Sequence, residues 1–285
     1  MSATPGDIEA VRAHFRVGHM VETKPYSNAL DLWRALDPVQ EPWTRRNARE
    51  CEWIFRGQVD ASWSLVPSAW RSVGPAADLL TRAREHCVRS RGDVPRPWEL
   101  QNLAEERILR DFISVADREG IELPPDTPRE SAPRRNHEVV TLAQHYGVPT
   151  GLLDFTRDPA VALFWAMHSD EPRDTGDLAF WAVFRLGWGV GVQAYYHAKV
   201  RNRNLLAQDG VTIEMTMADH FVPVVGRLPG LEECAGIPLE GLVKLTLPRT
   251  EVPELRRLLE IRGVTLARLV PGLHAAARTA LARLY

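Results

Sequence analysis

Apolar positions recur with a helical period in the first part of the chain and in extended runs in the second part. Residues 6–16 and 27–37 carry apolar side chains at three- and four-residue spacing, which predicts two short amphipathic helices. The same spacing runs through residues 97–120 and ends at a glycine, as expected for a longer helix. Between these segments, CEWIFRG at 51–57 is a compact apolar run that closes on glycine, which predicts a strand.

The second half of the chain carries most of the strand signals. Residues 137–169 predict two helical segments on either side of a turn that contains glycine and proline. Strand-like runs follow at 178–186, 210–216 and 242–248, and residues 252–263 predict a last helix. Because helices precede most strands and do not alternate regularly with them, the pattern favours an α+β fold.

The composition is that of an ordinary globular protein. The chain has 285 residues, 45% of them hydrophobic, enough for one elaborated domain or two small ones. No apolar run has the roughly 18 to 20 residues of a membrane helix, and the first residues lack the apolar region of a signal peptide. We therefore expect a cytoplasmic protein without a membrane partner.

Charge and cysteine spacing narrow the functional classes further. The formal net charge of −2 gives no electrostatic case for binding nucleic acid. Cys51, Cys87 and Cys234 lie far apart with no histidine at zinc-ligand spacing, so we expect neither a disulfide framework nor a bound metal. The sequence also lacks the nucleophile elbow of hydrolases, the phosphate-binding loop of nucleoside triphosphatases and the dinucleotide-binding G-x-G-x-x-G.

Five motifs follow one another in the order that is found in a bacterial family. They are FRGQ with W-x-L-x-P-x-x-x-R after it, LAQHYGVPTGLLDFTRDPAVALFWA, RNLLAQDGVTI, LVKLTLP and LVPGLHAAARTAL. In this order and spacing the chain resembles the FRG domain, a family named for its Phe-Arg-Gly motif. The resemblance implies a helical N-terminal segment over residues 1–48 and an FRG domain over 49–285, with a helical insertion at about 72–136. One departure is Gly151, where the family usually places an arginine.

Arg56 is the residue of the FRG motif that most needs an explanation. An arginine at the end of a buried strand is costly unless its guanidinium meets an anion or several carbonyl oxygens. One interpretation is an internal salt bridge to a carboxylate such as Asp154 or Asp60. The other is a cleft in which Arg56 binds a phosphate or ribose with its planar fork, while Gly57 lets the ligand approach the backbone.

The second interpretation has a parallel in ADP-ribosyltransferases, to whose fold the FRG domain is similar. There a strand-terminal arginine holds NAD, a serine or threonine motif supports it, and a glutamate contacts the nicotinamide ribose. The resemblance implies a mixed β-sheet core with NAD as substrate, Thr150 or Thr156 as the hydroxyl, and Gln208 or Glu214 near the ribose. If residues 208–214 form one extended strand, the side chains of Gln208 and Glu214 lie on the same face of it.

Three further residues of the long central motif are candidates for the same site. His145 is either a base or hydrogen-bond donor, or a structural histidine bonded to a carbonyl. Tyr146 either stacks on a base or packs in the core. Asp154 is either an N-cap or a partner for Arg56. We read Trp165 as a core anchor without a chemical role.

Two functional hypotheses follow. In the first, the protein is an NAD-dependent ADP-ribosyltransferase or NAD glycohydrolase, acting as a toxin or in phage defence on an acceptor that the sequence leaves open (protein, DNA, RNA or water). In the second, it is a non-catalytic module that senses a nucleotide or binds a partner. Either hypothesis requires the FRG strand, QHYG and LLDFT to converge on one cleft.

Overall fold

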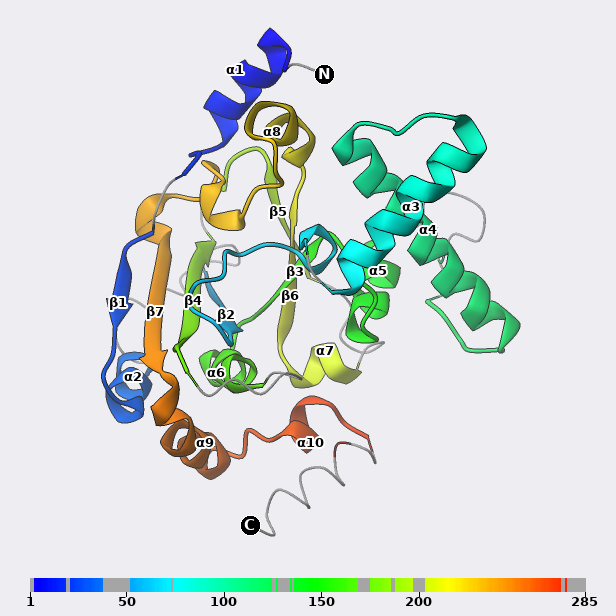
Figure 1. Ribbon diagram of the computed structural model, residues 1–285. Coiled ribbons are helices and arrows are strands. Elements are labelled where there is room, and N and C mark those ends of the chain that lie inside the picture. The colour runs from blue at the N-terminus through cyan, green and yellow to red at the C-terminus, as the bar shows by residue number, and fades with distance from the viewer. Residues whose placement is uncertain are drawn as a thin grey trace.

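A seven-stranded mixed sheet forms the centre of the protein (Figure 1). The computed structural model describes residues 3–18, 21–37, 52–72, 74–124, 127, 134, 136–168, 175–185, 188–196, 203–272 and 275. The strand order is β1-β7-β4-β2-β3-β6-β5, with β1 parallel to β7 and the other neighbours antiparallel. The strands are β1 (Thr23–Pro25), β2 (Glu52–Gln58), β3 (Leu152–Thr156), β4 (Asp177–Arg185), β5 (Val192–Tyr195), β6 (Gly210–Met215) and β7 (Leu242–Pro248).

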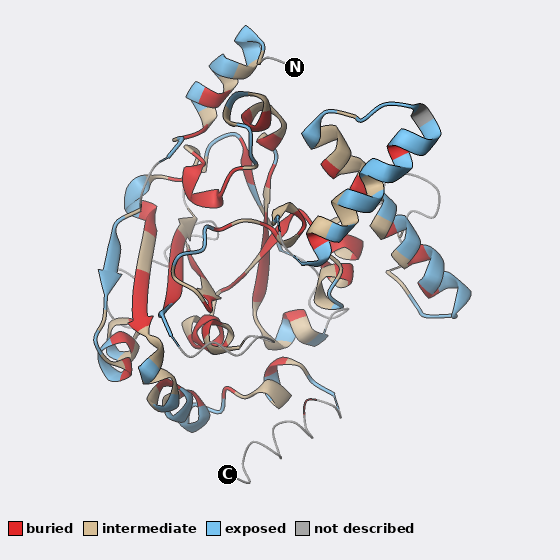
Figure 2. Ribbon diagram, viewed as in Figure 1, coloured by how far each residue is buried: buried red, intermediate tan, exposed pale blue. Residues whose placement is uncertain are grey.

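Helices cover both faces of this sheet, which confirms the α+β fold. On one face α2, α6 and α9 pack against β2, β4 and β7, and on the other α1 and α8 close a second core. Figure 2 shows the buried residues gathered on the strands and α6. The helices are α1 (Pro5–His14), α2 (Ala29–Ala35), α3 (Pro75–Arg91), α4 (Pro97–Arg118), α5 (His137–His145), α6 (Pro159–Met167), α7 (Arg203–Ala207), α8 (Ala218–Val225), α9 (Val252–Ile261) and α10 (Leu266–Leu269).

Several expected elements are confirmed and others were missed. The helices predicted near both ends and at 97–120 are present as α1, α2, α4 and α9. The N-terminal segment is not purely helical, because β1 lies between α1 and α2 and pairs with β7. The turn predicted between α5 and α6 also contains strand β3. Of the terminal LVPGLHAAARTAL motif, the structure describes only residues 269–272 and 275.

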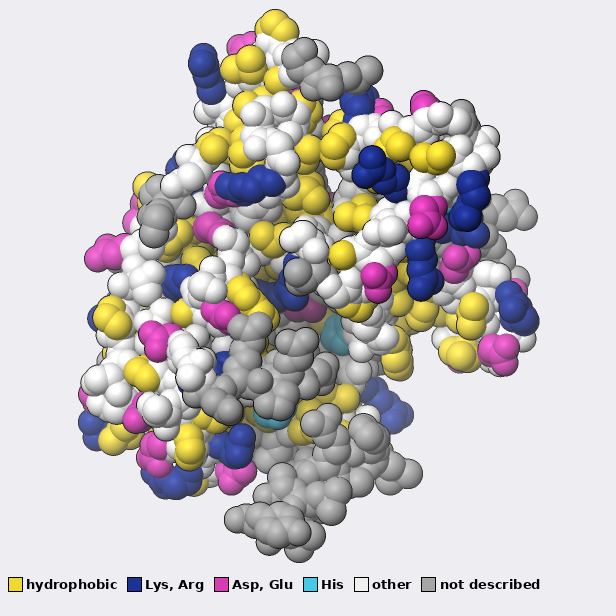
Figure 3. Space-filling model, viewed as in Figure 1, with side chains coloured by type: hydrophobic (Ala, Val, Ile, Leu, Met, Phe, Trp, Pro, Cys, Tyr) yellow, Lys and Arg dark blue, Asp and Glu magenta, His cyan; other side chains and the backbone are white. Residues whose placement is uncertain are grey.

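Helices α3 and α4 form a hairpin that projects from the sheet (Figure 1). They pack against each other, and α4 also contacts α5 and α8. Figure 3 shows basic and acidic side chains interspersed over this hairpin, with no continuous field of one sign. None of the helices among the described residues combines the length and apolar character needed to cross a membrane.

The sheet is almost divided between β2 and β3. β2 pairs with β4 at seven positions and β3 pairs with β6 at five, but β2 and β3 meet only at Phe55 and Thr156. Beyond that pair the strands separate, where Arg56 and Gly57 lie on one side and Asp154 on the other. The opening in the sheet therefore coincides with the FRG motif.

Helix α6 lies against β2 at Gly57 more closely than any side chain would permit. A Cβ on Gly57 would lie 2.0 Å from the carbonyl oxygen of Ala162 and 2.5 Å from the nitrogen of Ala166. Both atoms belong to the helix backbone, which has no flexible end to move aside. The expected role of Gly57 was to admit a ligand, and the structure gives a different reason for this glycine, which is close packing of helix on strand.

Gly57→Ala is expected to destabilise the fold because α6 must move away from β2. We expect a loss of about 1–3 kcal/mol in the free energy of unfolding, the usual cost of an overpacked core. Denaturant unfolding measures this loss, and Gly6→Ala is the matched control, because a Cβ there meets nothing closer than 3.8 Å. Equal stabilities of the two variants would contradict the packing role.

Candidate functional site

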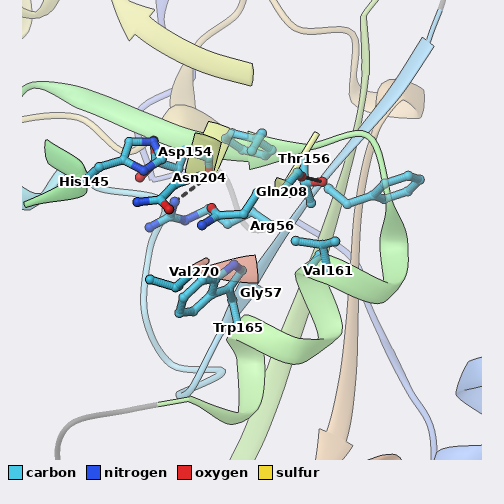
Figure 4. Close-up of a pocket in the computed structure, with 13 residues that line it drawn as sticks. Arg56, Gly57, His145, Asp154, Thr156, Val161, Trp165, Asn204, Gln208 and Val270 are labelled. Carbon is cyan, nitrogen blue, oxygen red and sulfur yellow. Dashed lines mark hydrogen bonds between the residues drawn. The ribbon is translucent and has the colours of Figure 1, made fainter. Parts of the chain in front are cut away.

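A cavity of about 310 Å³ lies at the opening between β2 and β3 (Figure 4). Cavities of roughly 300 to 1,000 Å³ are typical of small-molecule sites. The strands supply its floor, and residues of α5, α6, α7 and α10 or their ends supply its walls. It is lined by Phe55, Arg56, Gly57, His145, Asp154, Phe155, Thr156, Val161, Ala162, Trp165, Asn204, Gln208 and Val270.

The three motifs therefore converge as expected. Arg56 and Asp154 are 98 positions apart along the chain, yet the Nη1 of Arg56 donates a hydrogen bond of 2.6 Å to the carbonyl oxygen of Asp154. His145 lines the same cavity from the end of α5. Figure 4 shows His145 and Asp154 on one side of the arginine, with Gln208 and Thr156 on the other side.

The expected salt bridge of Arg56 is not present among the described residues. Its hydrogen bond goes to the main-chain oxygen of Asp154, while the carboxylate of Asp154 accepts from Gln144. The carboxylate of Asp60 accepts from Ser62 instead. The Nε of Arg56 is buried and has no hydrogen-bond partner among the described residues. A positive charge thus lies at the cavity floor without a carboxylate in contact with it.

Burial is the main influence on the charge of Arg56. Desolvation lowers the pKa of Arg56 to about 10, the nearby Asp154 opposes this shift, and the nearby Arg71 adds to it. Burial also lowers the pKa of Arg71. The guanidinium of Arg71 donates from Nε to the carbonyl oxygen of Val66 at 3.4 Å and lies 5.9 Å from the centre of the Trp63 ring, but it forms no ion pair with a described residue. Both guanidiniums are therefore partly desolvated and repel each other, which favours an anion between or beside them.

Asp154 is held by a chain of hydrogen bonds that starts in the core. The Nε2 of Gln144 donates to Oδ2 of Asp154, and the hydroxyl of Thr150 donates to Oε1 of Gln144. Thr150 is buried, and its backbone nitrogen donates to the hydroxyl of Ser68 at 3.1 Å. Of the two threonine candidates, Thr156 lines the cavity, whereas Thr150 lies behind it and acts through Gln144.

The two candidate site residues in the QHYG segment, His145 and Tyr146, lie in different environments. The Nε2 of His145 is buried, with no hydrogen-bond partner among the described residues. Tyr146 is 72% exposed, so the expectation that it packs in the core is wrong. It is also not among the residues that line the cavity, so the structure does not place it where it was expected to stack on a base. The chain turns at Gly147, whose φ of 86° requires a glycine, and this turn directs Tyr146 outward.

Gln208 and Glu214 do not share a face of one strand, contrary to expectation. β6 begins at Gly210, and Gln208 precedes it in the turn after α7. Gln208 lines the cavity, where its Nε2 donates to the carbonyl oxygen of Leu269 at 3.0 Å. Glu214 pairs with Leu152 at the other end of β3 from Thr156.

Glu214 belongs to a separate cluster at the edge of the sheet. Its carboxylate accepts from the hydroxyl of Tyr195 at 2.9 Å and lies 3.8 Å from Nε2 of His137. The rings of His137 and Tyr195 stack with centroids 3.7 Å apart. Burial lowers the pKa of His137. None of these three residues lines the cavity at Arg56.

Several residues near the cavity were not among the site residues expected from the sequence. Trp165, Asn204 and Val270 line it, and Arg71 lies close enough to affect Arg56. Trp165 was assigned to the core because the sequence of α6 is apolar all round, so no periodicity marks its open side. The signal for Arg71 was its place at the end of the W-x-L-x-P-x-x-x-R motif.

Gly151, where the resemblance led us to expect an arginine, lies against a buried carboxylate. A buried carboxylate, Glu105, accepts from the nitrogen of Gly151 at 3.1 Å, and a Cβ at this position would lie 3.0 Å from the Glu105 oxygen. The Nε of Arg134 lies 3.4 Å from the same carboxylate. A cation from another part of the chain therefore pairs with this carboxylate. In the residues described, no group of three or more His, Cys, Asp or Glu side chains is arranged to hold a metal.

Residues 51–175 match the family model of the FRG domain. The matched range includes β2, β3, α5 and α6 with Arg56, His145 and Asp154. Asn204, Gln208 and Val270 line the same cavity from outside that range. No curated protein and no solved structure matches the chain.

Glu105→Ala is expected to cost about 3–5 kcal/mol in the free energy of unfolding, because it leaves buried donors without an acceptor. These donors are the nitrogen of Gly151 and the half-buried Nε1 of Trp70, while Nε2 of Gln101 loses this acceptor but keeps the carbonyl oxygen of Ala69. Urea unfolding measures the loss. Asp111→Ala is the control, since that carboxylate is 56% exposed, pairs with Arg107 on the surface of the same helix and should contribute less than 1 kcal/mol. Similar losses in both variants would contradict a structural role specific to Glu105.

Proposed function

We propose that the cavity at the FRG motif binds NAD and that the protein is an NAD-dependent ADP-ribosyltransferase-like enzyme. The observation that carries the proposal is Arg56, a half-buried guanidinium that lines a small-molecule cavity and has no carboxylate in contact. A desolvated cation without an anion is costly unless a ligand supplies the charge. A phosphate or ribose of NAD meets this requirement through bidentate hydrogen bonds.

The apolar part of the cavity suits the nicotinamide ring. Trp165 is only partly buried, although its neighbours Phe164 and Ala166 are buried. Figure 4 shows the indole of Trp165 directed toward Arg56, with Val270 beside it. An aromatic face next to a cationic fork favours a ligand that joins a planar ring to anionic groups. Because the cavity is at the small end of the usual range, we propose that it holds the nicotinamide ribose half of NAD.

The arrangement of the motifs also supports the proposal. The arginine followed by glycine near the end of β2 is similar to the first motif of ADP-ribosyltransferases. Thr156 lines the same cavity and would be the supporting hydroxyl. We further propose a macromolecular acceptor and a role as a toxin or phage-defence effector. The runner-up is a nucleotide-sensing FRG module without catalysis.

The proposal is tested by incubating the full chain with NAD and cell extract while measuring nicotinamide release and label transfer. We expect NAD binding together with nicotinamide release. Binding without release would favour the nucleotide-sensing module. Absence of both binding and release would contradict the proposed function.

Arg56→Lys is expected to weaken NAD binding about tenfold or more, because lysine lacks the planar fork and loses a charge-assisted hydrogen bond. Titration calorimetry measures the affinity, and the melting temperature reports whether the variant is folded. The control is Arg107→Lys on the exposed face of α4, whose guanidinium pairs with Asp111 and lies outside the cavity. Unchanged NAD affinity in a folded Arg56→Lys protein would contradict the ligand role of Arg56.

A further inference from the structure

Asp154 is the one acidic side chain among the described residues that line the cavity. The sequence motifs predicted that Glu214 or Gln208 would lie near the ribose. Glu214 lies in the cluster with Tyr195 and His137, and Gln208 carries no charge. Transfer of ADP-ribose passes through a cationic, oxocarbenium-like ribose, which a neighbouring anion stabilises. The cavity has one candidate for that anion.

The carboxylate of Asp154 is fixed in position on one side only. Its Oδ2 accepts from Gln144, which is itself held by the buried Thr150. Its Oδ1 has no hydrogen-bond partner among the described residues. This oxygen is also absent from the buried side-chain atoms that lack a partner, so it is accessible from the cavity. One oxygen is thus occupied by a rigid support while the other remains available to a ligand, the arrangement expected of a preorganised charge.

The position of Arg56 relative to Asp154 fits this role. The guanidinium bonds to the carbonyl oxygen of Asp154 and makes no ion pair with the carboxylate, so the negative charge is not neutralised by direct contact. The two residues nevertheless lie close enough for their charges to attract each other. An anionic group of the substrate on Arg56 would therefore place the attached ribose beside Asp154.

We propose that Asp154 is the catalytic carboxylate of this site, stabilising the cationic ribose of NAD and accepting the proton of the attacking acceptor. This inference rests on the proposed function. The bond between ribose C1′ and the nicotinamide nitrogen breaks, and its electron pair leaves with neutral nicotinamide. An oxygen or nitrogen of the acceptor, or water, then forms the new bond to C1′. The proton of that nucleophile passes to Oδ1 of Asp154 and from there to solvent, so charge and atoms balance.

The test is Asp154→Asn in the full chain, with NAD as the probe and nicotinamide release as the readout. Asparagine keeps an oxygen for the Gln144 hydrogen bond and removes only the charge. We expect kcat to fall about 100-fold or more, the scale of losing one transition-state electrostatic contact, with little change in KM or melting temperature. Asp154→Glu restores the charge in a displaced position and is expected to retain more activity than Asp154→Asn.

Two further variants make the outcomes distinct. Asp111→Asn changes an exposed carboxylate on α4 and is expected to leave the rate unchanged. Glu214→Gln tests the carboxylate favoured by the sequence motif, and we expect it to retain the wild-type rate. Full activity in Asp154→Asn, equal losses in Asp154→Asn and Asp154→Glu, or a loss confined to Glu214→Gln would each overturn the assignment of Asp154 alone. A wild-type protein that neither binds nor consumes NAD would overturn the proposed function and this inference together.

Discussion

The close contact between α6 and β2 at Gly57 is the constraint on which the site depends. Because the helix backbone occupies the space of a side chain there, β2 is held against α6 just where it leaves β3. The strands have one pairing position, at Phe55 and Thr156, and separate beyond it. A sheet that continued its hydrogen bonds past this position would pair the groups that now border the cavity. The opening is therefore built into the packing of the FRG strand.

The separation of the strands also explains the unusual environment of Arg56. In a continuous sheet the carbonyl oxygen of Asp154 would be available to a backbone donor of the neighbouring strand, but here it accepts from the guanidinium. The arginine thus links the two halves of the sheet while leaving its charge without a carboxylate in contact. The structural role of Nη1 does not exclude a ligand-binding role, because Arg56 lines the cavity and its charge has no carboxylate in contact among the described residues.

Sequence patterns predicted the elements that depend on residues close together along the chain. They did not predict features that depend on contacts between distant segments. The amphipathic spacing of α4 and α9 located both helices, and the order of motifs predicted that Arg56, His145 and Asp154 would meet. Strand β3 was missed because it is only five residues long, follows α5 and precedes α6 along the chain, and carries no turn signal of its own. Gln208 was expected on the same strand as Glu214, but β6 begins only at Gly210, after a turn in which Asp209 has a positive φ of 48°. No periodicity in the sequence reveals that backbone conformation.

The central claim is that the Arg56 guanidinium binds a phosphate or ribose group of the ligand. A crystal structure of the full chain with NAD tests this claim most directly. The account predicts a phosphate or ribose oxygen of NAD within about 3 Å of the Arg56 guanidinium, a hydrogen-bond distance, with the nicotinamide ring against Trp165. NAD bound elsewhere on the protein would contradict the account. So would an Arg56 guanidinium paired with a carboxylate of the chain itself.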